Sequence, residues 1–469
     1  MKKIKGKIAL LLLFLSWLAL LWITGERTPW QMFNTREQGE SVSVYLGDIP
    51  VQNYDRMGFT KGIVRSVARN NSWLVGTDKG ELVAFDRGGR QLWRRSLGIG
   101  KLTSMGVSKD EKIVFVGEQS PTGQIFAVNI TNGDLLWKLA TDQFVGAEPA
   151  QRSYPSVAHM SVDAADNVFF TAYRFSMDQK GNRTNVGKVC AVDKKGTLLW
   201  QFPPNEPMDT YAVWCDVSDK AGSVVVSTST YEITPEMKYR DTLYFLNKTT
   251  GTLLHSEFLA AIVPFKTVVM RGSPQFSATG EYLAGCTSDG RGFLFNREGK
   301  LLWTRIISSA QKVGDAWINA GGRDAFVLPT GVLFSTVNTF NRENWQLPTP
   351  VEHPGNNSLF MFNVEGDFKY RHKAAGTIEE IAFAQDLVAC AVGRNVRTHN
   401  YQAAHGLTLL RLIDGECLQH FTTAGPLQAV ALSQDGNFAG GIEAPALTPE
   451  GKILGSYSFH IWDLSKIAH

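Results

Sequence analysis

Thiol groups are the side chains of this sequence with the most varied possible chemistry, and five cysteines are present. A redox centre or a zinc site would need cysteines at short spacings such as C-x-x-C. No C-x-x-C and no adjacent pair occurs, and four of the five stand inside apolar, strand-like runs. The pattern favours buried free thiols that pack as small hydrophobic groups, and it leaves a structural disulfide open. The cysteines are Cys190, Cys215, Cys286, Cys390 and Cys417.

Imidazole groups offer no better site. The nine histidines are scattered, and none form the H-x-x-x-H spacing that would bring two rings onto one zinc ion. The closest useful pair, His399 and His405, has no acidic or cysteine partner nearby, which indicates a polar loop. No G-x-S-x-G nucleophile motif, phosphate-binding loop or dinucleotide fingerprint is present. We therefore predict no catalytic residue, no metal site and no cofactor.

The sequence offers more candidate residues for partner binding than for catalysis, because arginine and aromatic residues occur in long stretches between the strand-like runs. The longest stretch, 338–357, also contains several prolines. Arg and Trp dominate interface hot spots, and proline reduces the ordering that a loop must undergo on binding. The predicted partner-binding residues are Arg342, Trp345, His353, Arg397, Tyr401 and Tyr239.

A repeated hairpin must position these stretches. In each copy an alternating apolar strand leads through a Gly or Asn turn into a strand that ends on Trp, at 80–93, 123–137 and 187–200. The closing residues lie about 45 to 65 positions apart, a period typical of propellers. Weaker copies close on His255, Trp303, Tyr370 and His420.

Each hairpin follows two more strand signals, so that one repeat supplies the four strands of a propeller blade. The chain contains seven complete repeats and a C-terminal fragment with only three strands. Residues 41–46 alternate correctly to supply the missing strand, which would close the ring and remove its open sheet edges. We predict an all-β, eight-bladed β-propeller; seven blades is the alternative if the fragment is a tail.

Sequence length is concentrated on one face of this propeller. With the strands of a blade named A to D from the ring centre outwards, B–C and D–A connections emerge on the same side. The predicted D–A link 140–156 is long, and the B–C connection is long in five blades. Long loops on a rigid scaffold are common binding sites, and tolerated insertions without a role are the alternative. The five B–C connections are 174–186, 231–240, 338–357, 394–405 and 444–455.

The N-terminus has the form of an export signal. Lys2, Lys3, Lys5 and Lys7 precede the apolar run 8–23, and no A-x-A cleavage site follows it. We predict an uncleaved anchor, with a cleaved signal and a buried core helix as alternatives. The predicted segments are 1–7, a transmembrane helix 8–24, a stalk 25–55 and the propeller 56–469. The positive-inside rule places segment 1–7 in the cytoplasm and the propeller outside it. Since the four lysines exceed the net charge of +3, the remainder is close to neutral and nucleic acid is not an expected partner.

The hairpins resemble the quinoprotein-like (PQQ-like repeat) β-propeller superfamily. The residues that carry the resemblance are Ala, Val or Phe, Asp or Asn, a turn with Gly, and Leu-Trp, at 84–93, 127–137 and 191–200; it extends from about residue 60 to the C-terminus. The superfamily includes quinone-dependent alcohol dehydrogenases and non-enzymatic members, among them a lipoprotein that helps assemble outer-membrane barrels. The dehydrogenases place a disulfide of adjacent cysteines over the quinone, and this chain has no adjacent cysteines.

The resemblance and the loops together predict a non-enzymatic, membrane-anchored member of a bacterial envelope. Its loop-rich face would bind a protein or an envelope polymer. A divergent quinone-dependent oxidoreductase is the alternative, and a sensor ectodomain is a third reading.

Overall fold

The computed structural model describes residues 41–50, 62–147, 153–177, 179, 183–229, 236–341, 351–393, 405–448 and 450–467. Residues 41–469 form one compact unit. The predicted segments 1–7 and 8–24 lie outside the described residues, as does most of 25–55. Within the described part, no helix has the length and apolar character needed to cross a bilayer.

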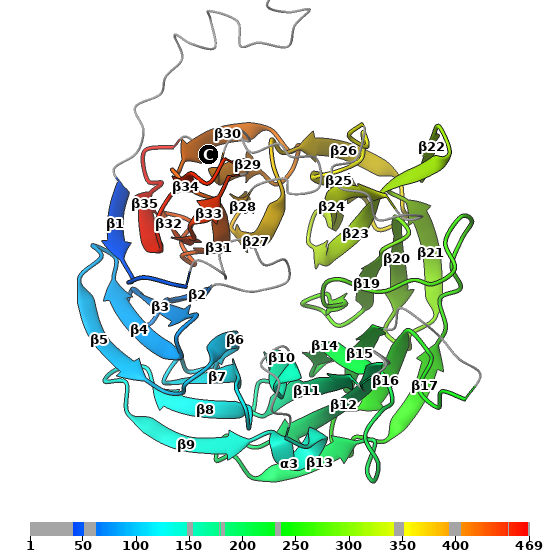
Figure 1. Ribbon diagram of the computed structural model, residues 1–469, viewed down its shortest axis with the longest axis horizontal. Helices are drawn as coiled ribbons and strands as arrows, with labels where there is room; N and C mark the ends of the chain where they lie inside the picture. Colours follow the sequence, from blue (N-terminus) through cyan, green and yellow to red (C-terminus); the bar gives the residue numbers. More distant parts are fainter. Residues whose placement is uncertain are drawn as a thin grey trace, which may run out of the picture. The chain divides into compact units, whose positions relative to one another are not determined.

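The described strands form eight four-stranded blades arranged in a ring (Figure 1). Blade 1 consists of β2 (Gly62–Val67), β3 (Ser72–Thr77), β4 (Glu81–Asp86) and β5 (Gln91–Ser96). Blade 2 consists of β6 (Lys101–Val107), β7 (Ile113–Gln119), β8 (Gln124–Asn129) and β9 (Leu135–Ala140). After the short helix α3 (Asp142–Val145), blade 3 consists of β10 (Ser156–Val162), β11 (Val168–Met177), β12 (Arg183–Val192) and β13 (Leu198–Phe202). Blade 4 consists of β14 (Tyr211–Ser218), β15 (Ser223–Ser229), β16 (Leu243–Asn247) and β17 (Leu253–Glu257).

The second half of the ring repeats this order. Blade 5 consists of β18 (Gln275–Phe276), β19 (Tyr282–Thr287), β20 (Arg291–Asn296) and β21 (Leu301–Ile306). Blade 6 consists of β23 (Ala316–Leu328), β24 (Gly331–Asn341), β25 (Ser358–Phe362) and β26 (Phe368–Lys373), with β22 (Gln311–Val313) paired to β23. Blade 7 consists of β27 (Ile378–Ala384), β28 (Leu387–Val392), β29 (Gly406–Arg411) and β30 (Cys417–Thr422).

Blade 8 closes the ring, and it joins the two ends of the compact unit. Its strands are β31 (Leu427–Leu432), β32 (Phe438–Glu443), β35 (Ser458–Asp463) and the N-terminal β1 (Ser41–Tyr45). β1 pairs antiparallel with β35 in a register that sets Ser43 opposite His460. The Ser43 hydroxyl lies 2.7 Å from His460 Nδ1, and His460 Nε2 lies 2.9 Å from the buried Glu443 carboxylate. The predicted closing strand and the eight blades are thus confirmed.

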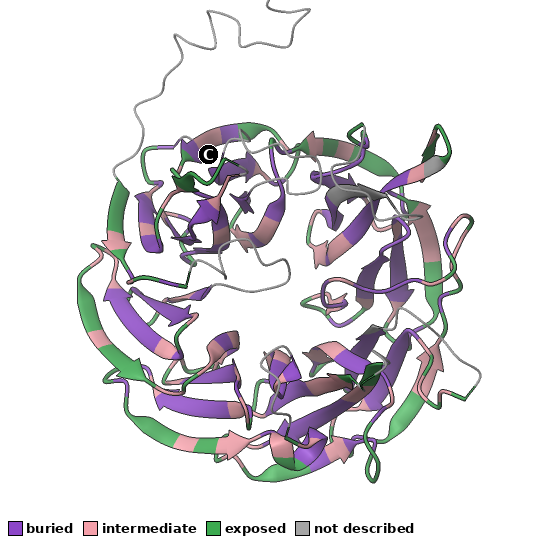
Figure 2. Cartoon of the chain, in the orientation of Figure 1, coloured by how far each residue is buried: buried purple, intermediate pink, exposed green. Residues whose placement is uncertain are grey.

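Hydrophobic clusters fill the interfaces between neighbouring blades. Between blades 1 and 2, for example, Leu74 and Leu82 pack with Val116 and Phe126, and all four are almost fully buried. Because the B and C strands are covered on both faces, their sequences are continuous apolar runs. The outer D strands, in contrast, are largely exposed (Figure 2). Figure 2 shows this order of burial around the ring.

The Trp that ends a hairpin links its blade to the next one. In four blades the indole N–H donates a hydrogen bond of 2.8 or 2.9 Å to a carbonyl in the following blade. The rings of Trp93, Trp137 and Trp200 also lie against the turn glycine of the following blade, so a Cβ there would lie within 3 Å of ring atoms. The sequence Gly-x-x-Leu-Trp therefore encodes both the turn and the contact that orients the next turn. The bonded pairs are Trp93 with Ile130, Trp137 with Lys194, Trp200 with Lys248 and Trp303 with Val364.

Candidate functional site: the loop face

B–C and D–A connections meet on one face of the ring, which we name the loop face; the opposite side, with A–B and C–D turns, is the turn face. Contacts between the two kinds of connection define the loop face. In blade 6 the His353 ring lies 2.7 Å from the Ser309 carbonyl of the preceding D–A link. In blade 4 the Lys238 N–H donates to the Asp209 carboxylate of the link before it, at 2.8 Å.

Blade 3 rises above its neighbours on the loop face. The segment 174–186, expected as a loop, is largely strand: β11 and β12 stay paired from Arg174 opposite Val186 to Met177 opposite Arg183. That expectation was wrong because the returning residues 183–185 are all polar and show no alternation, yet they pair with residues 175–177 in the backbone ladder. Arg183 stabilises the extension by stacking over the ring of Phe175, with 3.9 Å from guanidinium to centroid. Met177 is 60% exposed near its tip.

Blades 6 and 8 carry further extensions. β23 and β24 are among the longest strands described, and β22 adds a third strand beside their loop-face ends. In blade 8 the predicted connection 444–455 contains a small hairpin of β33 (Ala446–Leu447) and β34 (Ile453–Leu454). The loop face therefore presents several strand-supported projections rather than isolated loops.

Only two of the six predicted binding residues lie in the part of the chain that the structure describes. Arg342, Trp345, Arg397 and Tyr401 lie outside the described residues. Two others can be placed, and each has a structural contact within the ring.

His353 is 3% exposed and holds the base of the blade 6 loop. Burial lowers the pKa of His353, which favours the neutral ring. Its Nε2–H then donates to the Ser309 carbonyl, while Nδ1 accepts from the Gly355 N–H at 2.9 Å. This side chain attaches the end of the blade 6 B–C connection to the preceding D–A link, and its burial leaves little of it accessible to a partner.

Tyr239 is half-buried in an aromatic group on blade 4. Its ring lies 6.1 Å from those of both Phe202 and Tyr244. Its N–H donates to Asp209 at 3.1 Å. The residue connects the B–C connection of blade 4 to the end of blade 3, so the position of this connection is fixed by packing.

Charged side chains of the innermost strands are paired across blades. Arg65 of β2 and Glu380 of β27 lie 3.3 Å apart, and Glu380 also accepts the Val430 N–H of β31. These contacts join blades 7, 8 and 1 at the centre of the ring. Among the described residues, no group of three His, Cys, Asp or Glu side chains is arranged to hold a metal ion.

Asp216 of β14 joins three consecutive blades. Its carboxylate accepts the Ser161 hydroxyl of blade 3 at 3.0 Å and the Phe276 N–H of blade 5 at 2.8 Å. Burial, opposed by these hydrogen bonds, raises the pKa of Asp216 to about 6. Because the folded-state pKa exceeds that of the unfolded chain, near 3.9, the contribution to stability is present below about pH 4 and is lost as the pH rises to about 6.

Replacing Asp216 with Asn should therefore make the protein more stable at pH 7 and change little at pH 4. Asn retains an oxygen for the Phe276 N–H and an amide that can donate to Ser161. Thermal unfolding of both proteins across this pH range tests the prediction. A difference in melting temperature that does not vary with pH would show that burial of the charge is not the cause.

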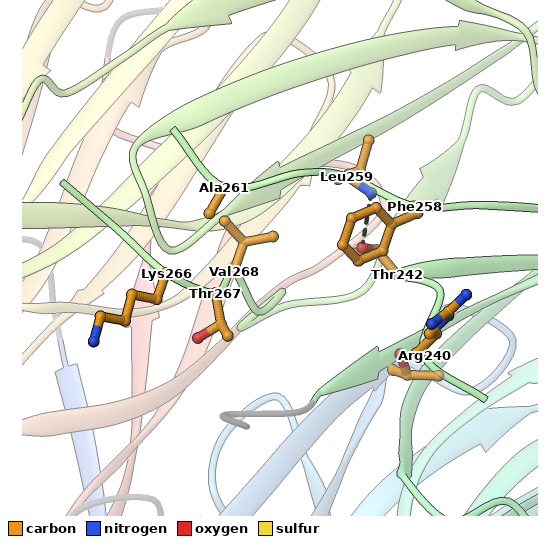
Figure 3. Close-up of a pocket in the computed structure, with 9 residues that line it drawn as sticks. Arg240, Thr242, Phe258, Leu259, Ala261, Lys266, Thr267 and Val268 are labelled. Carbon is orange, nitrogen blue, oxygen red and sulfur yellow. Dashed lines mark hydrogen bonds between the residues drawn. The ribbon is translucent and has the colours of Figure 1, made fainter. Parts of the chain in front are cut away.

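A pocket that sequence reasoning missed lies on the loop face of blades 4 and 5 (Figure 3). It forms where the end of the blade 4 B–C connection meets the D–A link 258–274. This link contains the apolar run from Phe258 to Pro264, in which no alternation marks a strand. That run was the only signal in the sequence, and it did not reveal the neighbours that complete the pocket.

Comparisons with known proteins agree with this architecture. A family model described as outer membrane protein assembly factor BamB matches residues 78–202. BamB from Moraxella catarrhalis has a TM-score of 0.51 at 12% identity, over 92% of this chain and 98% of that chain. A quinohemoprotein alcohol dehydrogenase from Pseudomonas putida HK5 has a TM-score of 0.59 at 11% identity, over 92% of this chain and 76% of that chain. A search of curated protein sequences finds no match.

The chain therefore folds as a β-propeller, and its residues 78–202 match a family model of the PQQ-like repeat type. The predicted resemblance is confirmed at this level. At 11% and 12% identity the two solved structures share only the fold with this chain, and one is BamB while the other is a quinohemoprotein alcohol dehydrogenase. Function must therefore be argued from the loop face.

Proposed function

We propose that the protein is a binding propeller of a bacterial envelope, and that its loop face holds a partner protein or an envelope polymer. The observation that carries this proposal is the set of raised hairpins on one face of a closed ring. The projections of blades 3 and 6 are continuous with blade strands, so their residues are held in place before a partner arrives. Preorganised surfaces of this kind bind with less loss of conformational entropy.

The description of the matching family model, an outer membrane protein assembly factor, supports a binding role. Quinone-dependent oxidation is the competing proposal, and the dehydrogenase likeness supports only the shared fold. The adjacent-cysteine disulfide that such an enzyme implies has no counterpart in this sequence. Cys190, Cys215, Cys286 and Cys390 are buried as free thiols.

For location, we propose that the apolar run 8–23 anchors the chain in the cytoplasmic membrane with the propeller outside. The lysines before the run support this orientation. Protease added to intact spheroplasts should then digest the propeller and leave an N-terminal fragment in the membrane. A mature chain that begins near Glu26 would contradict the anchor and leave export intact, whereas full protection from protease would contradict the orientation.

If the loop face binds a partner, side chains of the longest B–C connection, 338–357, should contribute to the affinity for that partner. Replacing Arg342 and Trp345 together with Ala should weaken partner binding by about 2 kcal/mol or more, because Arg and Trp are frequent hot spots. The ring should stay folded, since both residues follow β24 rather than belong to it. Quantitative pull-down with the tagged, membrane-extracted protein provides the measurement.

A matched control changes the turn face. Lys195 and Lys300 are exposed in C–D turns of blades 3 and 5, and their replacement with Ala should leave binding unchanged. If the loop variant binds its partner normally while the turn variant does not, the loop face is the wrong surface.

A further inference from the structure

The pocket on blades 4 and 5 has the features of a peptide-binding site. The empty space between its lining residues is about 330 Å³, a figure that includes open solvent in front of the recess. Its floor and walls combine hydroxyl, aliphatic and aromatic groups between two basic side chains (Figure 3). The lining residues are Thr228, Arg240, Thr242, Phe258, Leu259, Ala261, Lys266, Thr267 and Val268.

Hydrogen bonds fix the shape of the pocket without a ligand. The Leu259 N–H donates to Thr242 Oγ1 at 3.1 Å, which attaches the D–A link to blade 4. Arg291 donates to the Ala260 carbonyl at 2.6 Å, which attaches the same link to blade 5. Thr228 Oγ1 donates to the Asp241 carbonyl at 2.6 Å and holds the opposite wall. A ligand would therefore meet a preformed surface.

The rim of the pocket exposes apolar groups to solvent. Phe258, which lines the pocket, is 49% exposed, and Val263 in the same apolar run of the D–A link is 89% exposed. Exposed large side chains are ordinary when they stand alone, but here they adjoin a concave surface. The combination indicates that an apolar group of a partner covers them.

Two basic groups determine which partner fits. Figure 3 shows Arg240 and Lys266 toward opposite ends of the row of lining residues. Neither side chain makes a hydrogen bond or an ion pair with another residue in the described part of the chain. The neighbouring Asp241 carboxylate accepts the Ser256 hydroxyl. Two cations on either side of an apolar recess are complementary to carboxylates on either side of an aliphatic side chain.

We propose that this pocket binds a short segment of a partner protein in which an aliphatic side chain is flanked by aspartate or glutamate. The proposal rests on the binding role of the loop face and specifies its chemistry. A peptide suits the site better than a lipid surface, because the recess is concave and its hydroxyl groups can meet a peptide backbone. The aliphatic side chain would contact Phe258 and Val268, while the carboxylates would meet Arg240 and Lys266.

Random heptapeptides displayed on phage test this directly, with the full chain in detergent as the target. The enriched peptides should carry Leu, Ile or Val next to Asp or Glu. A synthetic peptide of the enriched sequence should bind about tenfold or more weakly to the double variant Arg240→Glu and Lys266→Glu. The control variant Lys195→Glu and Lys300→Glu carries the same charge change on the turn face and should bind as the native protein does. Circular dichroism melts establish that all three proteins are folded.

Several outcomes would overturn the proposal. Enriched peptides without acidic residues, or equal binding to both variants, would remove the role of the two cations. If no peptide binds, but phosphatidylglycerol vesicles bind the native chain and not the Arg240 and Lys266 variant, the surface contacts a membrane instead. If pocket variants have no effect while the Arg342 and Trp345 variant still loses its partner, the peptide site is wrong and the binding role of the loop face stands.

Discussion

Deleting Ser41–Tyr45 should lower the free energy of unfolding by about 4 kcal/mol, because the ladder between β1 and β35 would be lost at about 1 kcal/mol for each hydrogen bond. The deletion also exposes β35 as an unpaired edge, which should promote aggregation. Thermal and denaturant unfolding of the purified propeller provides the measurement. A synthetic peptide of residues 41–46, added in excess, should restore part of the lost stability.

Point variants separate closure from a general effect of changing the strand. Val44 is partly buried against the cluster between blades 8 and 1, whereas Ser41 is exposed. Replacing Val44 with Asp should therefore reproduce part of the loss, and the same change at Ser41 should be nearly neutral. An unchanged unfolding transition after the deletion would mean that β1 does not close the ring in solution.

Replacing Gly251 with Ala should destabilise the protein by about 3 kcal/mol, from backbone strain together with a clash. Gly251 has φ +68°, and a Cβ at this position would lie 2.5 Å from ring atoms of Trp200. The Trp200 ring cannot move away easily, since its indole N–H donates to the Lys248 carbonyl. Chemical denaturation compares the variant with the native protein.

Gly222, in the same blade, provides a matched control. Its φ is +65°, but no atom lies within 4 Å of a Cβ built there. Gly222→Ala should therefore cost only about 1 kcal/mol, the backbone contribution alone. In a Trp200→Leu background, the cost of Gly251→Ala should fall to the same value. Equal costs for the two glycines in the native background would show that the Trp contact does not determine the turn.

The repeats made the ring predictable from sequence because one local pattern encodes both strand and turn. Trp93, Trp137 and Trp200 each end a hairpin, and each ring packs against the turn glycine of the following blade. Closure was predictable for a different reason: the fragment lacked one strand, and 41–46 alternates as a strand should. The extent of the blade 3 hairpin was not predicted, since residues 183–185 are all polar and show no alternation, although they pair with residues 175–177 in the backbone ladder.

The candidate site was less accessible to sequence reasoning. Side-chain type suggested His353 as a partner contact, yet its ring is buried and bonded to the Ser309 carbonyl, which belongs to a different connection. The pocket on blades 4 and 5 likewise brings Arg240 and Lys266 together, and Lys266 lies in a D–A link that shows no repeat pattern. Residues that come together only through the ring cannot be recognised from spacing along one blade.

Photo-crosslinking in cells tests the central claim most directly, that the loop face is the binding surface. A photoreactive residue would replace Met177 near the tip of the blade 3 hairpin, or Val351 beside the blade 6 loop, both of which are exposed. Matched positions on the turn face are Lys195 and Lys300. We expect discrete adducts of higher mass from Met177 and Val351, and none from the two lysine positions. Adducts that form only from Lys195 and Lys300 would contradict the assignment of the binding face.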